Sequence, residues 1–196
     1  EKITSFLKNV PFQQQGSRRF SDIKLEVPPI PVPKGKDILS TQEGFGRILA
    51  NLALSKAELV KRIVTTSPDV TVSTNLGGWI NRTGIFSRNP IPSSSQESEV
   101  QSFQKWEQKP SGQHFELGIA ENNLFLILAA MGLSHELFSK RLIPIATLYD
   151  PFIYRGLDAL NYACYQDARF ILAATPSGIS LAPEGGAHQS IGTPLV

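Results

Sequence analysis

The sequence predicts an α/β fold: a doubly wound, mainly parallel sheet with helices on both faces, preceded by an extended proline-rich arm. Apolar helical segments alternate with short strand-like runs through the second half of the chain, and such alternation is typical of parallel sheets covered by helices. The chain has 196 residues, of which 41% are hydrophobic and 18% charged. This composition suits one domain with its own core.

The first 42 residues are expected to form an arm or interdomain linker. Five prolines fall between Pro11 and Pro33, and prolines remove hydrogen-bond donors and favour an extended backbone. The domain itself is expected over residues 43–196. Its first helix should start near Ser40, where a hydroxyl side chain precedes an acid in the first turn.

Local patterns predict the next elements in order. A short helix is expected over 56–62, and the alternation of Val and Thr over 69–74 predicts the first core strand. Later patterns predict a loop at 87–99, a helix at 119–133 that is buried because it is apolar almost all round, a strand at 142–148, a helix at 154–165, a strand at 170–174 and a glycine-rich loop at 183–186.

Ligands of such sheets bind at the carboxyl ends of the strands. We therefore expect residues 74–78, 149–154 and 175–188 to lie around one rim. No internal repeat is found in the sequence.

Charge and composition argue against several classes of protein. The chain carries 19 Lys and Arg against 17 Asp and Glu, a net charge of +2, so neither nucleic acid nor a membrane is expected as a partner. The longest apolar run, 124–133, is about half the length of a bilayer span. The single cysteine, Cys164, excludes an intrachain disulfide and favours a cytoplasmic location. Both ends are expected to lie inside a longer protein, and no secretory signal opens the chain.

Several short motifs are incomplete. The glycines at 44 and 46 form part of a dinucleotide-binding pattern, but no strand precedes them. His114, His135 and His188 do not have the spacing of metal ligands, so no metal site is predicted in this chain. No Gly-x-Ser-x-Gly elbow is present.

Three features could carry chemistry. Glu121 opens the most hydrophobic helix; such an acid can simply complement the helix dipole, but a carboxylate at the mouth of a buried helix is costly and typical of sites. Three aromatic residues fall within 149–154, where they could pack in the core or line a pocket for a flat ring. His188 follows Gly185 and Gly186 in a loop, and it could be either functional or merely solvated.

In their order and spacing, these features resemble the pyrimidine-binding domain of thiamine-diphosphate enzymes of the transketolase and pyruvate dehydrogenase type. The segments 40–49, 83–87 and 118–121 are most similar to the homodimeric-type pyruvate dehydrogenase, and the proline-rich arm is similar to its interdomain linker. The loop 185–189 is closer to transketolase.

The resemblance implies roles for particular residues. Glu121 would contact a ring nitrogen of the aminopyrimidine and so promote loss of the thiazolium proton, while the cofactor serves as an electron sink for decarboxylation. His188 would face the substrate, so Glu121 and His188 are the expected catalytic residues. The expected cofactor-binding residues are Glu121, Phe152, Tyr154, Tyr149, Asn75 and Leu76.

The resemblance also implies partners. Family members hold Mg²⁺ and the diphosphate through a Gly-Asp-Gly segment of another domain, and this sequence contains no Gly-Asp-Gly. The chain would then supply half of a site, completed by the cofactor- and metal-binding domain of a second subunit in a homo-oligomer. An acyltransferase component of a multienzyme complex is a further expected partner.

The expected function is that of the decarboxylating component of a 2-oxo acid (pyruvate) dehydrogenase, an oxidoreductase. Two alternatives stay open. One is ketol transfer of the transketolase type, and the other is a non-catalytic dimerisation module.

Overall fold

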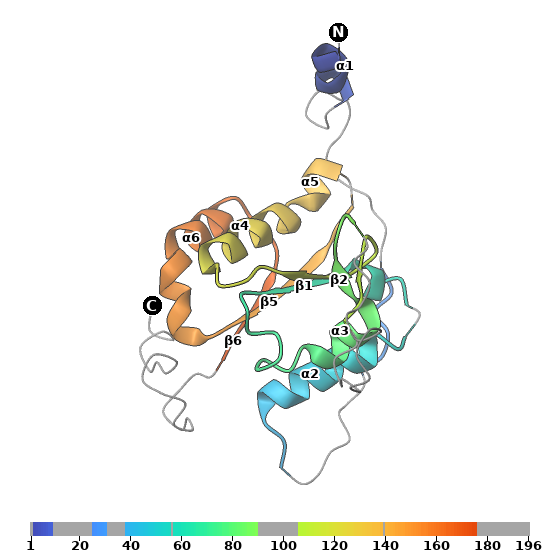
Figure 1. The fold of residues 1–196 in the computed structure, drawn as a ribbon, viewed down its shortest axis with the longest axis vertical. Helices are drawn as coiled ribbons and strands as arrows, with labels where there is room; N and C mark the ends of the chain where they lie inside the picture. The colour runs from blue at the N-terminus through green and yellow to red at the C-terminus, as the bar shows by residue number, and fades with distance from the viewer. Residues whose placement is uncertain are drawn as a thin grey trace.

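One parallel sheet organises the part of the chain that the structure describes, as Figure 1 shows. The computed structural model describes residues 2–9, 25–30, 38–55, 57–89, 106–138 and 140–175. The strands are β1 (Ile63–Ser67), β2 (Ile85–Phe86), β3 (Gln108–Lys109), β4 (His114–Glu116), β5 (Ile143–Leu148) and β6 (Ile171–Ala174). They lie in the order β3-β2-β4-β1-β5-β6, and all neighbouring pairs are parallel. The predicted α/β class is confirmed.

Helices cover both faces of the sheet. In Figure 1, α2 and α3 lie on one side of the strands, and α4 and α6 lie on the other. The helices are α1 (Lys2–Asn9), α2 (Thr41–Leu52), α3 (Gly77–Thr83), α4 (Glu121–Gly132), α5 (Ser134–Phe138) and α6 (Leu157–Tyr165), with short 3-10 segments η2 (Val60–Arg62) and η4 (Asp150–Gly156).

The neighbouring inner strands β1 and β5 supply alternate side chains to two cores. Ile63 of β1 and Ile145 of β5 pack with α2 and α3, in a cluster that includes Trp79. Val64 and Ala146, one residue further along each strand, pack instead with α4 and α6. This alternation follows from the two-residue period of a strand and explains why both faces need helices.

The start of α2 confirms the predicted helix signal. Ser40 is the N-cap, and its side chain accepts a hydrogen bond from the Glu43 N–H over 3.1 Å. Upstream, α1 is a helix that the prediction of an extended arm does not anticipate; it ends before the first proline, Pro11. Residues 25–30 of the proline-rich stretch have no regular secondary structure, and the division into arm and domain stays a prediction.

The predicted strand at 69–74 is wrong. The core strand is β1, and the residues after it form turns closed by the bonds from the Thr74 N–H to the Val70 carbonyl and from the Leu76 N–H to the Thr71 carbonyl. Pro68 cannot donate to a ladder, and Asp69 has a positive φ of 60°. Threonine and serine hydroxyls also bond to nearby carbonyls here, and such local bonds compete with strand pairing.

Other boundaries differ more modestly. The segment expected as a helix over 56–62 contains only η2 among its described residues. The helix expected over 154–165 begins as η4, which starts at the strand end, and continues as α6. The expected all-round burial of α4 is wrong, because Leu126 is 53% exposed while Leu124 and Phe125 are fully buried.

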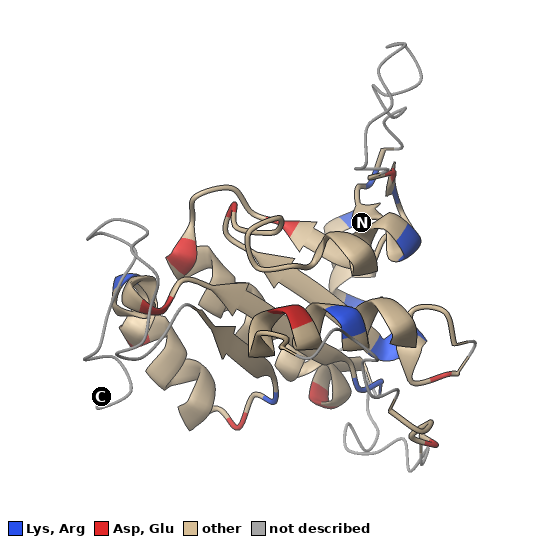
Figure 2. Ribbon diagram, turned by 90° about the horizontal axis from the view of Figure 1, so that it is seen from below, with Lys and Arg blue, Asp and Glu red and all other residues tan. Residues whose placement is uncertain are grey.

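Some predictions fall outside the described residues. They are most of the loop at 87–99, the glycine-rich loop at 183–186 and His188. Within the described helices, none is long and apolar enough to cross a membrane. Figure 2 shows basic and acidic residues on several of the described elements, and one such pair, Glu43 and Arg47, forms an ion pair on α2.

Candidate functional site

The carboxyl ends of the parallel strands bring several segments to one edge of the sheet. Residues 68–76 follow β1, residues 117–120 follow β4, η4 follows β5 and Thr175 follows β6. The threonine hydroxyls of Thr74 and Thr147 lie 2.8 Å apart. Gln42 of α2 joins this edge, since it bonds to the Ser73 carbonyl and accepts from the Thr175 hydroxyl over 2.5 Å. The described parts of the second and third predicted rim segments meet, because the Asp150 N–H donates to the Thr175 carbonyl over 3.4 Å, and Thr74 of the first segment contacts β5 through Thr147.

Glu121 is the first residue of α4 and lies at this edge. The chain turns into the helix through Gly118, which has a positive φ of 64°, and no side chain caps the helix start. The Glu121 side chain is 7% exposed, and its Oε1 accepts a hydrogen bond from Arg155 Nη1 over 2.7 Å. A carboxylate at a helix start also meets the favourable end of the helix dipole.

Arg155 joins Glu121 to the aromatic segment of η4. Its Cζ lies 4.2 Å from the centroid of the Phe152 ring, a cation–π contact. The Tyr149 ring lies 6.2 Å from the Phe152 ring at an angle of 49°. We call Glu121, Arg155 and Phe152 the Glu121 cluster. It brings together two of the residues that the sequence predicted for the site, and it adds an arginine that was not predicted.

Close packing fixes where η4 lies. A Cβ on Gly156 would stand 2.3 Å from Phe125 Cδ2, so only glycine lets η4 approach α4 this closely. Arg155, the preceding residue, is therefore carried to the start of α4, where Glu121 lies. Tyr154 lies on the same segment and is 49% exposed.

The remaining predicted cofactor residues differ in their surroundings. Asn75 is exposed and has a positive φ of 62°. The space against its backbone is kept open by Gly46 of α2, where a Cβ would lie 2.4 Å from the Asn75 carbonyl oxygen. Leu76 is fully buried among Trp79 and Ile80 in the core, so its side chain faces the core. The roles assigned to Asn75 and Leu76 stay predictions.

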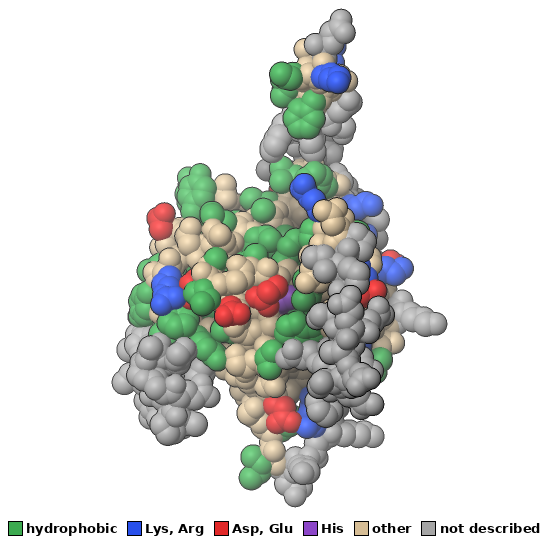
Figure 3. Space-filling view, viewed as in Figure 1, with side chains coloured by type: hydrophobic (Ala, Val, Ile, Leu, Met, Phe, Trp, Pro, Cys, Tyr) green, Lys and Arg blue, Asp and Glu red, His purple; other side chains and the backbone are tan. Residues whose placement is uncertain are grey.

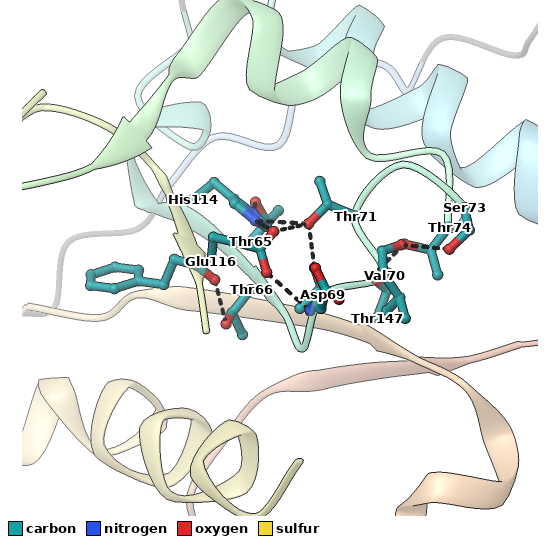
Figure 4. A network of polar contacts seen from close by, with 12 residues as sticks. Thr65, Thr66, Asp69, Val70, Thr71, Ser73, Thr74, His114, Glu116 and Thr147 are labelled. Atoms are coloured by element: carbon teal, nitrogen blue, oxygen red, sulfur yellow. Dashed lines mark hydrogen bonds and ion pairs between the residues drawn. The ribbon is translucent and has the colours of Figure 1, made fainter. Parts of the chain in front are cut away.

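A second polar group lies at the same edge and is drawn in Figure 4. His114 of β4 is fully buried, with Nδ1 2.9 Å from the Thr65 hydroxyl and Nε2 3.2 Å from the Thr71 hydroxyl. The Thr71 hydroxyl also donates to Glu116 Oε2, and Thr71 Oγ1 lies 2.5 Å from Ser67 Oγ. We call these five residues the His114 network.

The hydrogen bonds of the network determine the donors and acceptors around the Thr71 hydroxyl. The Thr71 hydroxyl has one proton, which it gives to Glu116, so it accepts from Ser67 and from a proton on His114 Nε2. The Thr65 hydroxyl lies 2.9 Å from His114 Nδ1 and also donates to the Gln113 carbonyl over 3.5 Å. Every polar side chain of the network has a partner, which is what burial requires.

The network also holds the segment after β1. Glu116 Oε1 accepts from the Asp69 N–H over 3.0 Å, as Figure 4 shows. Burial by itself raises the pKa of Glu116, but hydrogen bonds from His114, Thr71 and the Asp69 N–H outweigh it and hold the pKa below the ordinary value of 4.5. Glu116 is therefore an anion at neutral pH.

The sequence missed Arg155, Glu116 and the polar role of His114. The signal for Arg155 was its position three residues after Phe152 on a segment of helical type, which places both side chains on one face. Nothing in the sequence marked His114, since its partners Thr65 and Thr71 lie 49 and 43 residues away.

Acidic and basic side chains both lie on the face drawn in Figure 3. Figure 3 shows acidic side chains near the middle of the face in view and further acidic side chains beside basic ones towards its margins. Within the described ranges, no group of three or more His, Cys, Asp or Glu residues could hold a metal ion.

Comparison with known proteins points to one class of enzyme. No family model matches the chain. A pyruvate dehydrogenase E1 component from Corynebacterium glutamicum is 27% identical over 187 residues, which cover 91% of this chain and 20% of that protein. The chain thus spans about a fifth of the length of that relative. Over most of its length the chain is similar to part of a pyruvate dehydrogenase component, in agreement with the resemblance of its motifs to thiamine-diphosphate enzymes.

Proposed function

We propose that this chain is the pyrimidine-binding domain of the decarboxylating component of a thiamine-diphosphate-dependent 2-oxo acid dehydrogenase that acts on pyruvate. The observation that carries the proposal is the nearly buried Glu121 carboxylate, which Arg155 links to the Phe152 ring at the carboxyl edge of a parallel sheet, where ligands of such sheets bind. The similarity to a pyruvate dehydrogenase component supports an oxo acid substrate over ketol transfer.

The residues of the Glu121 cluster fit an aminopyrimidine. A carboxylate can accept a hydrogen bond from a ring nitrogen or exchange a proton with it, and an aromatic side chain offers a face to a flat ring. When bound, thiamine diphosphate supplies the electron sink for cleavage of a carbon–carbon bond. In this proposal Glu121 holds or moves a proton at the pyrimidine nitrogen, and Phe152 stacks on the ring.

Neighbouring residues complete the proposed half-site. Tyr149 lies against Phe152 and supports its orientation, and Tyr154 flanks the ring from the same segment. Asn75 and Leu76 are assigned to the junction of the two cofactor rings. His188 is proposed to carry a proton at the substrate carbonyl, in a part of the chain outside the described residues.

The other half of the site is assigned to a partner domain. The resemblance attributes Mg²⁺ and the diphosphate to a Gly-Asp-Gly segment, which this sequence lacks. We therefore propose a homo-oligomer in which the metal-binding domain of a second subunit meets the Glu121 edge. The acyl group would pass to an acyltransferase component, and the cytoplasm is the proposed compartment.

The test uses the assembled enzyme, with added thiamine diphosphate and Mg²⁺. We expect carbon dioxide release from pyruvate that requires both additions, and no turnover of a ketose phosphate. Efficient use of the sugar would instead support transketolase chemistry. No turnover of either substrate, with the oligomer intact, would support a dimerisation module.

The half-site has its own measurement. The 196-residue chain alone should show no binding of thiamine diphosphate at micromolar concentrations in calorimetry with Mg²⁺, because it lacks the assigned diphosphate anchor. Micromolar, Mg²⁺-dependent binding by the chain alone would contradict the half-site.

A further inference from the structure

Arg155 contacts the two groups that the proposed ring would need. Its Nη1 donates to Glu121 Oε1 over 2.7 Å, and its Cζ lies 4.2 Å from the centroid of the Phe152 ring. A guanidinium is a flat cation with several N–H donors, so it can satisfy a carboxylate and an aromatic face together. An aminopyrimidine is also flat and also offers N–H donors. The two groups therefore compete for the same pair of partners.

The exposure of the side chains shows which group can move. Glu121 is 7% exposed and Arg155 is 53% exposed, so the arginine is the solvent-facing member of the pair. A half-exposed side chain changes rotamer within picoseconds to nanoseconds, and ion pairs that reach solvent are weak. A ligand that needs Glu121 can therefore displace Arg155 at low cost.

The backbone beneath Arg155 is held in place. Gly156 lies so close to Phe125 that a Cβ would stand 2.3 Å from its ring, and the η4 segment packs along α4. Movement of Arg155 thus involves its side chain and leaves the positions of Phe152 and Glu121 unchanged.

We propose that Arg155 is a side-chain gate: without ligand it covers Glu121 and Phe152, and an aminopyrimidine ring binds only after displacing it. The gate keeps a nearly buried carboxylate paired with a cation until the ligand arrives, which avoids the cost of an unpaired buried charge. Because the ligand binds only the open fraction, the gate lowers the apparent affinity by that fraction. This inference rests on the proposed function.

The test measures cofactor binding by the assembled enzyme with Arg155→Ala. Thiamine diphosphate with Mg²⁺ is the probe, and stopped-flow protein fluorescence gives the association rate constant and the apparent dissociation constant. Removal of the guanidinium should raise the rate constant and lower the dissociation constant, each by about two- to fivefold, as expected for loss of a partly exposed ion pair. Arg155→Lys should lie between, since an ammonium keeps the charge but lacks the flat fork.

Arg169→Ala is the matched control. Arg169 is 58% exposed and pairs with Asp167 over 3.2 Å, so the change removes a similar exposed pair away from Glu121 and should leave binding unchanged. Weaker or equal binding by Arg155→Ala would overturn the gate, and weaker binding would assign Arg155 a direct contact with the ligand. If neither wild type nor any variant binds the cofactor, the proposed function fails and the gate fails with it.

Discussion

The Glu121 cluster and the His114 network lie at the same edge of the sheet, and each contains a glutamate, yet they are built differently. His114 is fully buried, and its ring nitrogens contact hydroxyls from β1 and from the turns that follow it. Glu121 is paired instead with the half-exposed Arg155. The network ties strands and a turn together, whereas the cluster leaves a carboxylate whose partner can be exchanged.

This difference separates stability from ligand binding. Groups that are buried and fully hydrogen-bonded resist change, because removal of one leaves another without a partner. A group whose ion-pair partner is exposed to solvent can exchange that partner easily. We therefore expect substitutions in the His114 network to change the free energy of unfolding, and substitutions in the Glu121 cluster to change chemistry.

The largest expected effect is that of Glu121→Gln on turnover by the assembled enzyme. Glutamine has nearly the same shape, so packing at the start of α4 is kept, but it cannot exchange a proton at the pyrimidine nitrogen. The turnover number should fall by about a hundred- to ten-thousand-fold. Glu107→Gln is the control: the Glu107 side chain is 63% exposed, and its substitution should leave the turnover number unchanged. Turnover within a few-fold of wild type would reduce Glu121 to a partner of the helix dipole.

A smaller but substantial effect is expected from His114→Leu on stability. Leucine fills a similar volume but leaves the buried Thr65 and Thr71 hydroxyls without their imidazole partner. The free energy of unfolding, measured with urea on the 196-residue chain, should fall by about 2–4 kcal/mol.

A double-mutant cycle with Thr71→Val sharpens this prediction. The two changes should be coupled by about 0.5–3 kcal/mol, because the residues share one network. His135→Leu serves as the control for coupling: its Nε2 contacts Glu136 over 3.1 Å, outside the His114 network, so it should show no coupling with Thr71→Val. Unchanged stability in His114→Leu, with lost turnover, would reverse the contrast between the two regions.

The smallest expected effect is the pH dependence contributed by Glu116. Its pKa is held below 4.5 in the folded protein, so its carboxylate contributes stability above the unfolded value, and this contribution is lost as the pH falls through the folded pKa. Urea unfolding of wild type and Glu116→Gln should therefore differ by a constant amount near neutral pH, and the difference should shrink below about pH 4.5. A difference that grows in acid would show that the hydrogen bonds favour the protonated carboxyl.

The sequence predicted best where one local signal was strong. Ser40 caps α2 as expected, and Glu121 is the first residue of α4, because the start of a helix is determined by residues that are neighbours in the sequence. The alternation at 69–74 resembles a strand but forms turns, because hydroxyl side chains can bond to carbonyls of their own turn. Strand β4 was not predicted, because three residues are too few to show the two-residue period of a strand. The role proposed for His188 lies beyond the described residues and stays a prediction.

By itself the sequence determined the alternation of helices and strands, hence a parallel sheet, and the edge at which residues 74–78 and 149–154 would lie. These follow from local periodicity and from the rule that parallel strands end on one side. Only the tertiary structure decided the partners of the polar groups. Arg155 reaches Glu121 across 34 residues and His114 reaches Thr65 across 49, and such pairs depend on how closely η4 and β4 pack against their neighbours. Local sequence patterns do not predict that packing, because it depends on side chains that come into contact only when the chain has folded.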